Sequence, residues 1–332
     1  MIFRGRSARG CAGAGLSILC AAIAFFPLAS EAASSRSASS ALQQDTQQFE
    51  ALPLVRSRQN HLLVRAFINE KPALLIVDSG SPGTVIASKR RGHFGVSQVP
   101  TDSKYPSRVR VNGSYSSLVM AHRLRLGGLN IADVPAISVD LSGARRAART
   151  LHEPEADGIL GTDVLFASRA VLDCQKQLLI LNLQPEVPAV VPGMDFRGFQ
   201  KVPMFVTEGF NLYVNGYVNG SQARLMVDTG AFATLLHRPF VRRLHIRTEQ
   251  TRLQSAAINL KEEGLDIARI RKLSVGTFDM VGKEVGVVDL GGILHEALQL
   301  SPPAVGLLGA EVLNSHHGII DFGTRTLYLK KT

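Results

Sequence analysis

The sequence contains little cysteine, no tryptophan and few aromatic residues of any kind. There are three cysteines in 332 residues, and aromatic residues make up 6% of the chain. So few cysteines argue against a disulfide-rich scaffold and against a zinc domain held by cysteine ligands. Charged residues are also sparse, at 19%, whereas 45% of the residues are apolar. This balance is typical of a chain that buries a core rather than one that stays disordered.

Long apolar runs are missing everywhere except near the N-terminus. Three arginines before position 10 precede an apolar stretch over residues 11–28, and small residues follow in Ser30-Glu31-Ala32-Ala33. A basic start, an apolar stretch and a small-x-small site together predict a secretory signal peptide over residues 1–32. The alternative is an uncleaved membrane anchor, but glycines and Pro27 interrupt the apolar stretch.

Removal of that segment would leave Cys174 as the last cysteine and lower the net charge from +10 to about +8. An exported protein without an internal disulfide fits a bacterial periplasm best, with secretion as the wider possibility. Residues 33–49 are rich in Ser, Ala and Gln, so we expect a flexible lead-in.

The positive charge raises the question of an anionic partner, but no motif supports one. The most basic stretch, residues 145–149, lacks interleaved aromatic residues and is interpreted as a surface loop. We therefore expect no nucleic-acid partner. His316-His317 has no further ligand at a suitable spacing, so we expect no metal and no cofactor.

The rest of the chain is one unit repeated about 150 residues apart. Residues 61–86 align without a gap with residues 211–236. Three further blocks follow in the same order, and the offset between the copies drifts only from 150 to 148. These blocks pair residues 124–141 with 273–290, residues 157–165 with 305–313, and Asp173 with Asp321. Chance does not maintain four ordered blocks, so we infer an internal duplication.

Each copy has the pattern of an all-β unit. Short runs of Val, Ile, Leu, Phe and Tyr are separated by turn pairs such as Asn69-Glu70 and Asn219-Gly220. Brief helices are expected only over residues 161–168, over residues 309–315 and after each aspartate motif described below. Asp173 is interpreted as a turn residue that enters a final hairpin, and the same holds for its counterpart in the second copy.

The duplication sets the expected domains. We predict a first lobe over residues 50–185, a Pro-rich linker over residues 186–198 and a second lobe over residues 199–332. Two similar β-barrel lobes are expected to pack about a pseudo-two-fold axis, as the subunits of a homodimer would. One chain would then supply both halves of a shared site and act as a monomer.

An aspartate follows an apolar strand at the same position of each copy. The two motifs are Asp78-Ser79-Gly80-Ser81 and Asp228-Thr229-Gly230-Ala231. A single Asp-Ser/Thr-Gly segment is a weak signal, because such residues commonly end a strand in a turn. Two copies at equivalent positions near a two-fold axis can bring their carboxylates into one site.

At this point the sequence resembles the retropepsin-like and pepsin-like aspartic peptidases. Besides the two aspartate motifs, each copy carries the family's second signature of two apolar residues and a glycine. These are Ile159-Leu160-Gly161 and Leu307-Leu308-Gly309. The resemblance is closest to exported bacterial retropepsin-like proteins, here with both lobes on one chain. It implies the acid protease fold and a catalytic pair formed by Asp78 and Asp228.

The resemblance also implies roles for the neighbours of the two aspartates. Ser79 and Thr229 would fasten each loop to the opposite lobe, while Gly80 and Gly230 would leave room beside the carboxylates. The family covers its substrate with flap hairpins. Those hairpins are expected at Asn112-Gly113 with Tyr115, and near Gly264 in the second copy.

One difference between the motifs gives a finer hypothesis. Ser81 follows the first motif and Ala231 the second. Because a hydroxyl that donates to a carboxylate favours its charged form, we expect Asp78 to be the ionised base and Asp228 to carry the proton.

The sequence thus predicts an aspartic endopeptidase that activates water between two carboxylates, without a covalent intermediate. Its partner would be a peptide or protein in extended conformation. The alternative is a catalytically inactive peptide-binding protein that retains the fold.

Overall fold

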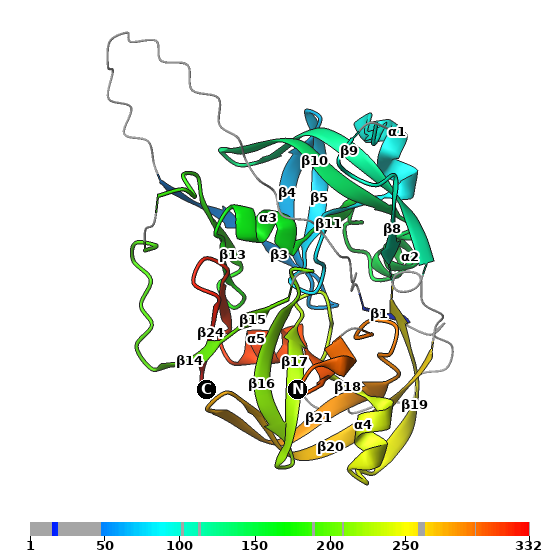
Figure 1. Cartoon of the computed structure of the whole chain (residues 1–332), viewed down its shortest axis with the longest axis vertical. Helices are drawn as coiled ribbons and strands as arrows, with labels where there is room; N and C mark the ends of the chain where they lie inside the picture. The colour runs from blue at the N-terminus through cyan, green and yellow to red at the C-terminus, as the bar shows by residue number, and fades with distance from the viewer. Residues whose placement is uncertain are drawn as a thin grey trace.

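The computed structural model of the chain describes residues 15–18, 48–100, 103–111, 114–187, 190–207, 209–257, 263–295 and 297–331. These residues form two β-rich lobes with a third sheet between them (Figure 1). The predicted all-β architecture with two equivalent lobes is confirmed.

The N-terminal lobe is built on one sheet that closes on itself through an extra pairing of β4 with β9. Buried and more exposed residues alternate over residues 64–68 of β4, as in a half-buried strand, whereas the last three residues of β5 are all buried. In sheet order the strands are β3 (Val55–Arg56), β4 (Leu62–Ile68), β5 (Lys71–Val77), β11 (Gly158–Leu160), β6 (Val85–Ala87), β10 (Leu129–Val139), β9 (Ser114–Leu126) and β7 (Ser97–Gln98), with β8 (Arg108–Val111) paired to β9.

The C-terminal lobe repeats this arrangement, and an extra pairing of β20 with β16 closes its sheet. The strand at one edge, β1, comes from the predicted signal peptide and runs parallel to β19, with Gly15 opposite Gln254. In sheet order the strands are β1 (Gly15–Ile18), β19 (Thr248–Ala257), β20 (Glu263–Val275), β21 (Phe278–Val288), β18 (Leu235–His237), β22 (Ala304–Leu308), β17 (Ser221–Val227), β16 (Leu212–Val218) and β15 (Phe205–Val206).

A six-stranded sheet joins the lobes, and each lobe contributes three strands to it. At its centre β12 pairs antiparallel with β23, so that Leu172 lies opposite Ile320. These two residues are equivalent in the repeat, which places the pseudo-two-fold axis between them. Both are fully buried in an apolar core that runs through both lobes. In sheet order the strands are β14 (Phe199–Pro203), β24 (Thr326–Lys330), β23 (Ile319–Asp321), β12 (Val171–Asp173), β13 (Leu178–Asn182) and β2 (Phe49–Pro53).

The turn between the first two long strands of each lobe has the same construction. Asn69 and Glu70 have φ angles of 48° and 63°, and Asn219 has a φ of 51°. Two left-handed residues in a row are the geometry of a tight hairpin turn, which confirms these predicted turns. The Asn69 side chain also accepts the backbone N–H of Arg123 at 2.9 Å, and Asn219 accepts that of Lys272 at 3.1 Å. Each turn is thereby anchored to the next hairpin of its own lobe.

The helices are short, and the helices expected after the apolar-glycine signatures are confirmed. They are α3 and α5, while the helices after the aspartate motifs are α1 with η1 and α4. The helical segments are η1 (Ser88–Arg90), α1 (Arg91–Phe94), α2 (Ser142–Thr150), α3 (Thr162–Ala167), α4 (Arg238–Arg243), η2 (Ala297–Gln299) and α5 (Ala310–Ser315).

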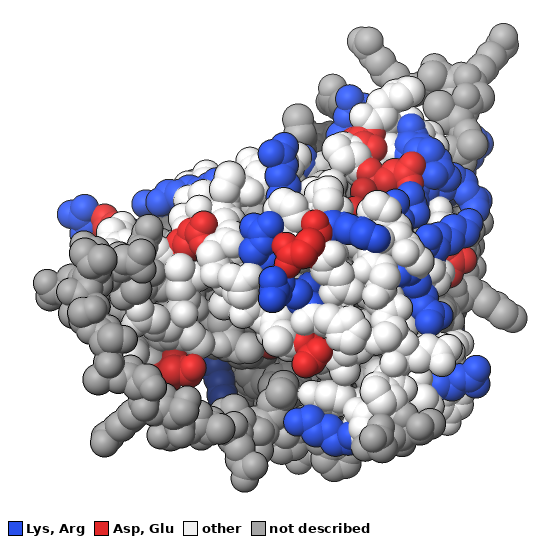
Figure 2. Space-filling model, turned by 90° about the horizontal axis from the view of Figure 1, so that it is seen from above, with Lys and Arg blue, Asp and Glu red and all other residues white. Residues whose placement is uncertain are grey.

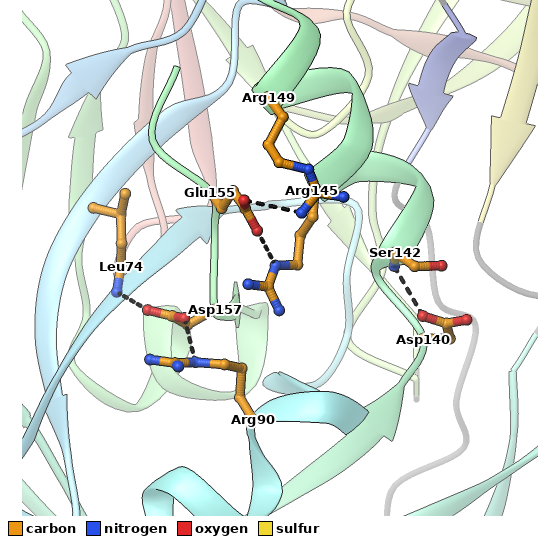
Figure 3. Close-up of polar contacts among 8 residues, drawn as sticks. All are labelled: Leu74, Arg90, Asp140, Ser142, Arg145, Arg149, Glu155 and Asp157. Carbon is orange, nitrogen blue, oxygen red and sulfur yellow. Dashed lines mark hydrogen bonds and ion pairs between the residues drawn. The ribbon is translucent and has the colours of Figure 1, made fainter. Parts of the chain in front are cut away.

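The basic stretch at residues 145–149 is not a loop, so that interpretation was wrong. It forms α2, because its alanines and arginines have high helix propensity. Figure 3 shows α2 beside Glu155, whose carboxylate oxygens lie 2.5 Å from Arg145 Nε and 3.0 Å from Arg149 Nη1. Two of the three arginines therefore form ion pairs with an acidic residue of the same lobe.

The Pro-rich linker packs against the molecule where the structure describes it. Phe196 stacks on Tyr328 with ring centroids 4.1 Å apart, and Met194 contacts the same apolar cluster on the six-stranded sheet. The linker thus covers one face of the sheet that joins the lobes.

Among the described residues, none of the helices has the length and apolar character that a membrane crossing would require.

Candidate active site

The two aspartates end equivalent strands and are held by equivalent backbone bonds. Asp78 follows β5 and donates its N–H to the carbonyl of Leu160 at 3.0 Å. Asp228 follows β17 and donates to the carbonyl of Leu308 at 3.0 Å. The strands β11 and β22 run parallel to β5 and β17, which places each apolar-glycine signature directly beside an aspartate loop.

The glycines that close these signatures lie against the backbone of the aspartate loops. A Cβ on Gly161 would lie 2.5 Å from the carbonyl oxygen of Gly83, and a Cβ on Gly309 would lie 2.5 Å from that of Ala233. No larger residue fits either position without moving backbone. Ile159 and Leu307, two residues before the glycines, are fully buried.

Ser79 and Thr229 join the two loops across the boundary between the lobes. The Ser79 hydroxyl donates to the carbonyl of Val227 at 2.8 Å, and the Thr229 hydroxyl donates to the carbonyl of Val77 at 2.8 Å. Each hydroxyl oxygen also accepts the other residue's backbone N–H, at 2.9 Å for the Ser79 N–H and 3.1 Å for the Thr229 N–H. Four buried hydrogen bonds therefore hold the loops in register about the two-fold axis.

Each motif glycine lies against the carboxylate of the opposite lobe. A Cβ on Gly80 would lie 2.5 Å from Asp228 Oδ1, and a Cβ on Gly230 would lie 2.7 Å from Asp78 Oδ1. The two aspartates, which lie 150 positions apart in the sequence, therefore share one site. Both are fully buried.

The environment of this pair favours a shared proton. Burial raises the pKa of Asp78 well above its ordinary value, and the adjacent charge of Asp228 raises that pKa further. Backbone N–H groups oppose the shift only in part. A side-chain hydrogen bond with Asp228 adds to the rise in the pKa of Asp78. Because two carboxylates have no donor between them, such a hydrogen bond requires that the pair hold a proton.

The side-chain contact on which the expected assignment of base and acid depends is not formed. The Ser81 hydroxyl donates to the carbonyl of Gly83 at 2.8 Å and not to a carboxylate. Asp228 Oδ1 instead accepts two backbone N–H groups, from Gly230 and Ala231, both at 2.9 Å. Because donors to a carboxylate favour its charged form, these two bonds favour the ionised form of Asp228.

Two hairpins stand where flaps were expected. In the first, β8 pairs with β9, but the turn residues Asn112 and Gly113 lie outside the described residues. Tyr115 is 72% exposed, opposite Arg110 in the ladder. In the second, β19 pairs with β20, and Gly264 lies within β20 opposite Gln254 rather than at the turn. The hairpins are present, while no contact places Tyr115 or Gly264 at the aspartate pair.

Two threonines that the sequence motifs did not indicate support the loops. Thr84 Oγ1 donates to Asp163 at 2.9 Å and accepts the Gly161 N–H at 3.4 Å, while Thr234 Oγ1 accepts the Gly309 N–H at 3.1 Å. Burial raises the pKa of Asp163 to about 6. The two threonines are equivalent in the repeat, so the alignment of the copies held the signal.

A buried histidine near the site was likewise not indicated by any sequence motif. His61 is 4% exposed, and its Nε2 lies 3.0 Å from the carbonyl oxygen of Gly230 in the other lobe. The aligned residue of the second copy is Asn211, and this difference was the available signal.

A cavity opens beside this histidine in the N-terminal lobe. Its walls are mainly apolar, and Ile76, on the strand that leads to Asp78, is one of them. The lining also includes Leu63, Leu141 and Arg145. At the equivalent place in the other lobe, between β21 and β22, the described residues form only the short η2. Because α2 supplies part of the cavity wall, the two lobes offer different surfaces near the site.

The positive charge is spread rather than gathered at one site. Figure 2 shows Lys and Arg side chains over one face of the molecule with acidic side chains among them. Arg123, for example, lies 2.9 Å from Glu70. In the part of the chain that the structure describes, no three His, Cys, Asp or Glu side chains cluster as metal ligands would.

Comparison with known proteins agrees with this geometry. A protein-family model described as aspartyl protease matches residues 64–164 and residues 214–312. The two matches cover the two lobes and contain both aspartate motifs and both apolar-glycine signatures. None of the curated proteins matches the chain.

Proposed function

Since the chain belongs to the aspartyl protease family, we propose that it is an aspartic endopeptidase with Asp78 and Asp228 as its catalytic residues. The observation that carries the proposal is the pair itself. Two buried carboxyls from opposite lobes share one site, and the pKa of Asp78 is raised there. Such a pair offers one acid and one base at the same pH.

The reaction follows from these two protonation states. Ionised Asp228 takes a proton from a water molecule held between the carboxyls, and the water oxygen attacks the peptide carbonyl carbon. Asp78 gives its proton to the carbonyl oxygen, which forms a neutral tetrahedral diol. The diol collapses when Asp228 gives its proton to the amide nitrogen and Asp78 takes a proton from one diol hydroxyl. The C–N bond then breaks, which leaves a free amine and a carboxylic acid. The enzyme is never acylated, and both carboxyls return to their first states.

The substrate we propose is a peptide in extended conformation. The two hairpins β8–β9 and β19–β20 extend from opposite lobes, and strand edges bind extended peptides through backbone hydrogen bonds. The apolar walls of the cavity beside Ile76 suit an apolar side chain next to the cleaved bond. We further propose that residues 1–32 direct export to the periplasm or the medium, on the basis of their signal-like pattern.

The test is to incubate the protein with an unbiased peptide library from about pH 3 to about pH 7, with and without a statine-type inhibitor. Asp78→Asn and Asp228→Asn serve as the paired variants. We expect cleavage that the inhibitor blocks and that either substitution abolishes. Cleavage that survives both substitutions would contradict the proposal. Peptide binding without any cleavage would support the inactive, peptide-binding alternative.

A further inference from the structure

His61 connects the N-terminal lobe to the aspartate loop of the C-terminal lobe. It is the last residue before β4, and its backbone N–H is held by the Ser57 hydroxyl at 3.1 Å. Its side chain crosses to the carbonyl oxygen of Gly230 at 3.0 Å. Because a carbonyl can only accept, Nε2 carries the hydrogen of this bond.

The peptide group that receives this bond also serves a catalytic carboxylate. The Gly230 carbonyl and the Ala231 N–H belong to one peptide unit, and that N–H donates to Asp228 Oδ1 at 2.9 Å. A donor on the carbonyl polarises the unit and makes its N–H a stronger donor. The hydrogen bond from His61 therefore strengthens the bond that holds the charged form of Asp228.

The equivalent peptide of the first lobe has a different role. The Ser81 N–H turns to the backbone carbonyl of its own Asp78, at 3.3 Å, and not to the carboxylate. Asp78 Oδ1 accepts the Gly80 N–H at 2.8 Å. The residue aligned with His61 is Asn211, so the two-fold symmetry of the site is broken at this contact.

We propose that His61 is a positioning residue that fixes the roles within the pair. Through the Gly230–Ala231 peptide it favours the carboxylate of Asp228, so that Asp78 carries the shared proton. This inference rests on the proposed function, in which that distribution of protons decides which carboxyl acts as base.

The charged groups around the ring do not have to change state for this role. Arg145 of α2 and Glu153 line the cavity that His61 also lines, while the ring's Nε2 contacts the Gly230 carbonyl of the aspartate loop. Arg145 forms an ion pair with Glu155 (Figure 3), and its Nε lies 2.5 Å from Glu155 Oε2. The Nε2–H bond is available in the neutral ring as well as in the charged ring, so the contact can persist across the working pH range.

The test compares His61→Leu, which removes the donor, with His61→Gln, which restores an N–H donor at similar reach. His93→Leu, at an exposed position on α1, is the matched control for a His-to-Leu change. The readouts are the pH dependence of kcat/KM and the carboxyl titration of the folded proteins, followed by NMR with 13C-labelled aspartate.

For His61→Leu we expect the acidic limb of kcat/KM to move to higher pH by about half a unit to one unit, about a 3- to 10-fold change in proton affinity. The lower of the two titration steps of the pair should move by the same amount. His61→Gln and His93→Leu should match the wild type. A His61→Leu profile identical to the wild type, or a His61→Gln profile shifted as far as that of His61→Leu, would overturn the inference.

The two readouts separate this inference from the proposed function. If no variant and no wild-type protein cleaves any peptide, the proposed function fails, while the carboxyl titration still decides the role of His61.

Discussion

Ser79 and Thr229 exchange hydrogen bonds across the lobe boundary, each donating its hydroxyl to the opposite backbone and accepting the other's N–H. Both residues are buried. A buried polar group that loses its hydrogen-bond partner is left without water as well, and the protein loses the full desolvation free energy of that group. Removing one of these hydroxyls should therefore destabilise the fold more than removing an exposed hydroxyl with the same bonds.

We predict that Thr229→Val lowers the free energy of unfolding by about 2–4 kcal/mol. The substitution leaves the Val77 carbonyl and the Ser79 N–H without the hydroxyl that serves both. Thr229→Ser keeps the hydroxyl and should cost under about 1 kcal/mol. Urea unfolding measures both values. Equal stability of the two variants would contradict this account of the interface.

Gly80→Ala should lower the rate of peptide cleavage about 100-fold while leaving the fold largely intact. The added Cβ would lie 2.5 Å from Asp228 Oδ1, so the carboxylate must move away from its partner. A displacement near 1 Å at the reacting groups costs about 100-fold in rate. Gly143→Ala in α2 is the control, because its Cβ would meet no atom within 4 Å. Peptide cleavage by the two folded variants tests this, and similar rates would show that the site tolerates the methyl group.

The sequence was sufficient for those features of the fold that the repeat defines. Equivalent positions about a two-fold axis must meet, and Leu172 indeed lies opposite Ile320. The same logic brings Asp78 and Asp228 together. The turn at Asp173 was also predicted correctly from its residue type, since the Asp173 carboxylate accepts the N–H of Lys176 there.

The features that sequence reasoning missed depend on partners distant along the chain. The Ser81 hydroxyl could reach a carboxylate or a carbonyl, and only the path of the loop to Gly83 decides between them. The contact of His61 with Gly230 likewise requires the lobes to be assembled. Helix α2 is different, because its alanines and arginines already have high helix propensity, so its local sequence was sufficient to predict a helix.

Cys174 should be inert in the folded protein. It is buried, and burial raises the pKa of its thiol to about 12. Because the thiolate is the reactive form, we expect no labelling by a thiol reagent at about pH 8 in native buffer and rapid labelling in denaturant. The measurement uses Cys11→Ser/Cys20→Ser, in which Cys174 is the only cysteine. Rapid labelling in native buffer would show that the thiol is accessible.

The raised pKa of Asp78 makes a signed prediction about stability. A carboxyl whose pKa is higher in the folded than in the unfolded chain stabilises the fold most below its unfolded value, and this contribution is lost as the pH rises through the folded value. Asp78→Asn removes the ionisable group and should therefore be more stable than the wild type at neutral pH. The difference should shrink towards about pH 3, where the wild-type carboxyl is protonated in both states.

Asp140 provides the matched control of opposite sign. It accepts the Ser142 N–H at 2.9 Å, and this bond is the main cause of its lowered pKa (Figure 3). Asp140→Asn should be less stable than the wild type at neutral pH, and that difference should also vanish as the pH falls. Urea unfolding of the three proteins at several pH values measures both trends. If Asp78→Asn proved less stable than the wild type at neutral pH, Asp78 would not carry the proton of the pair.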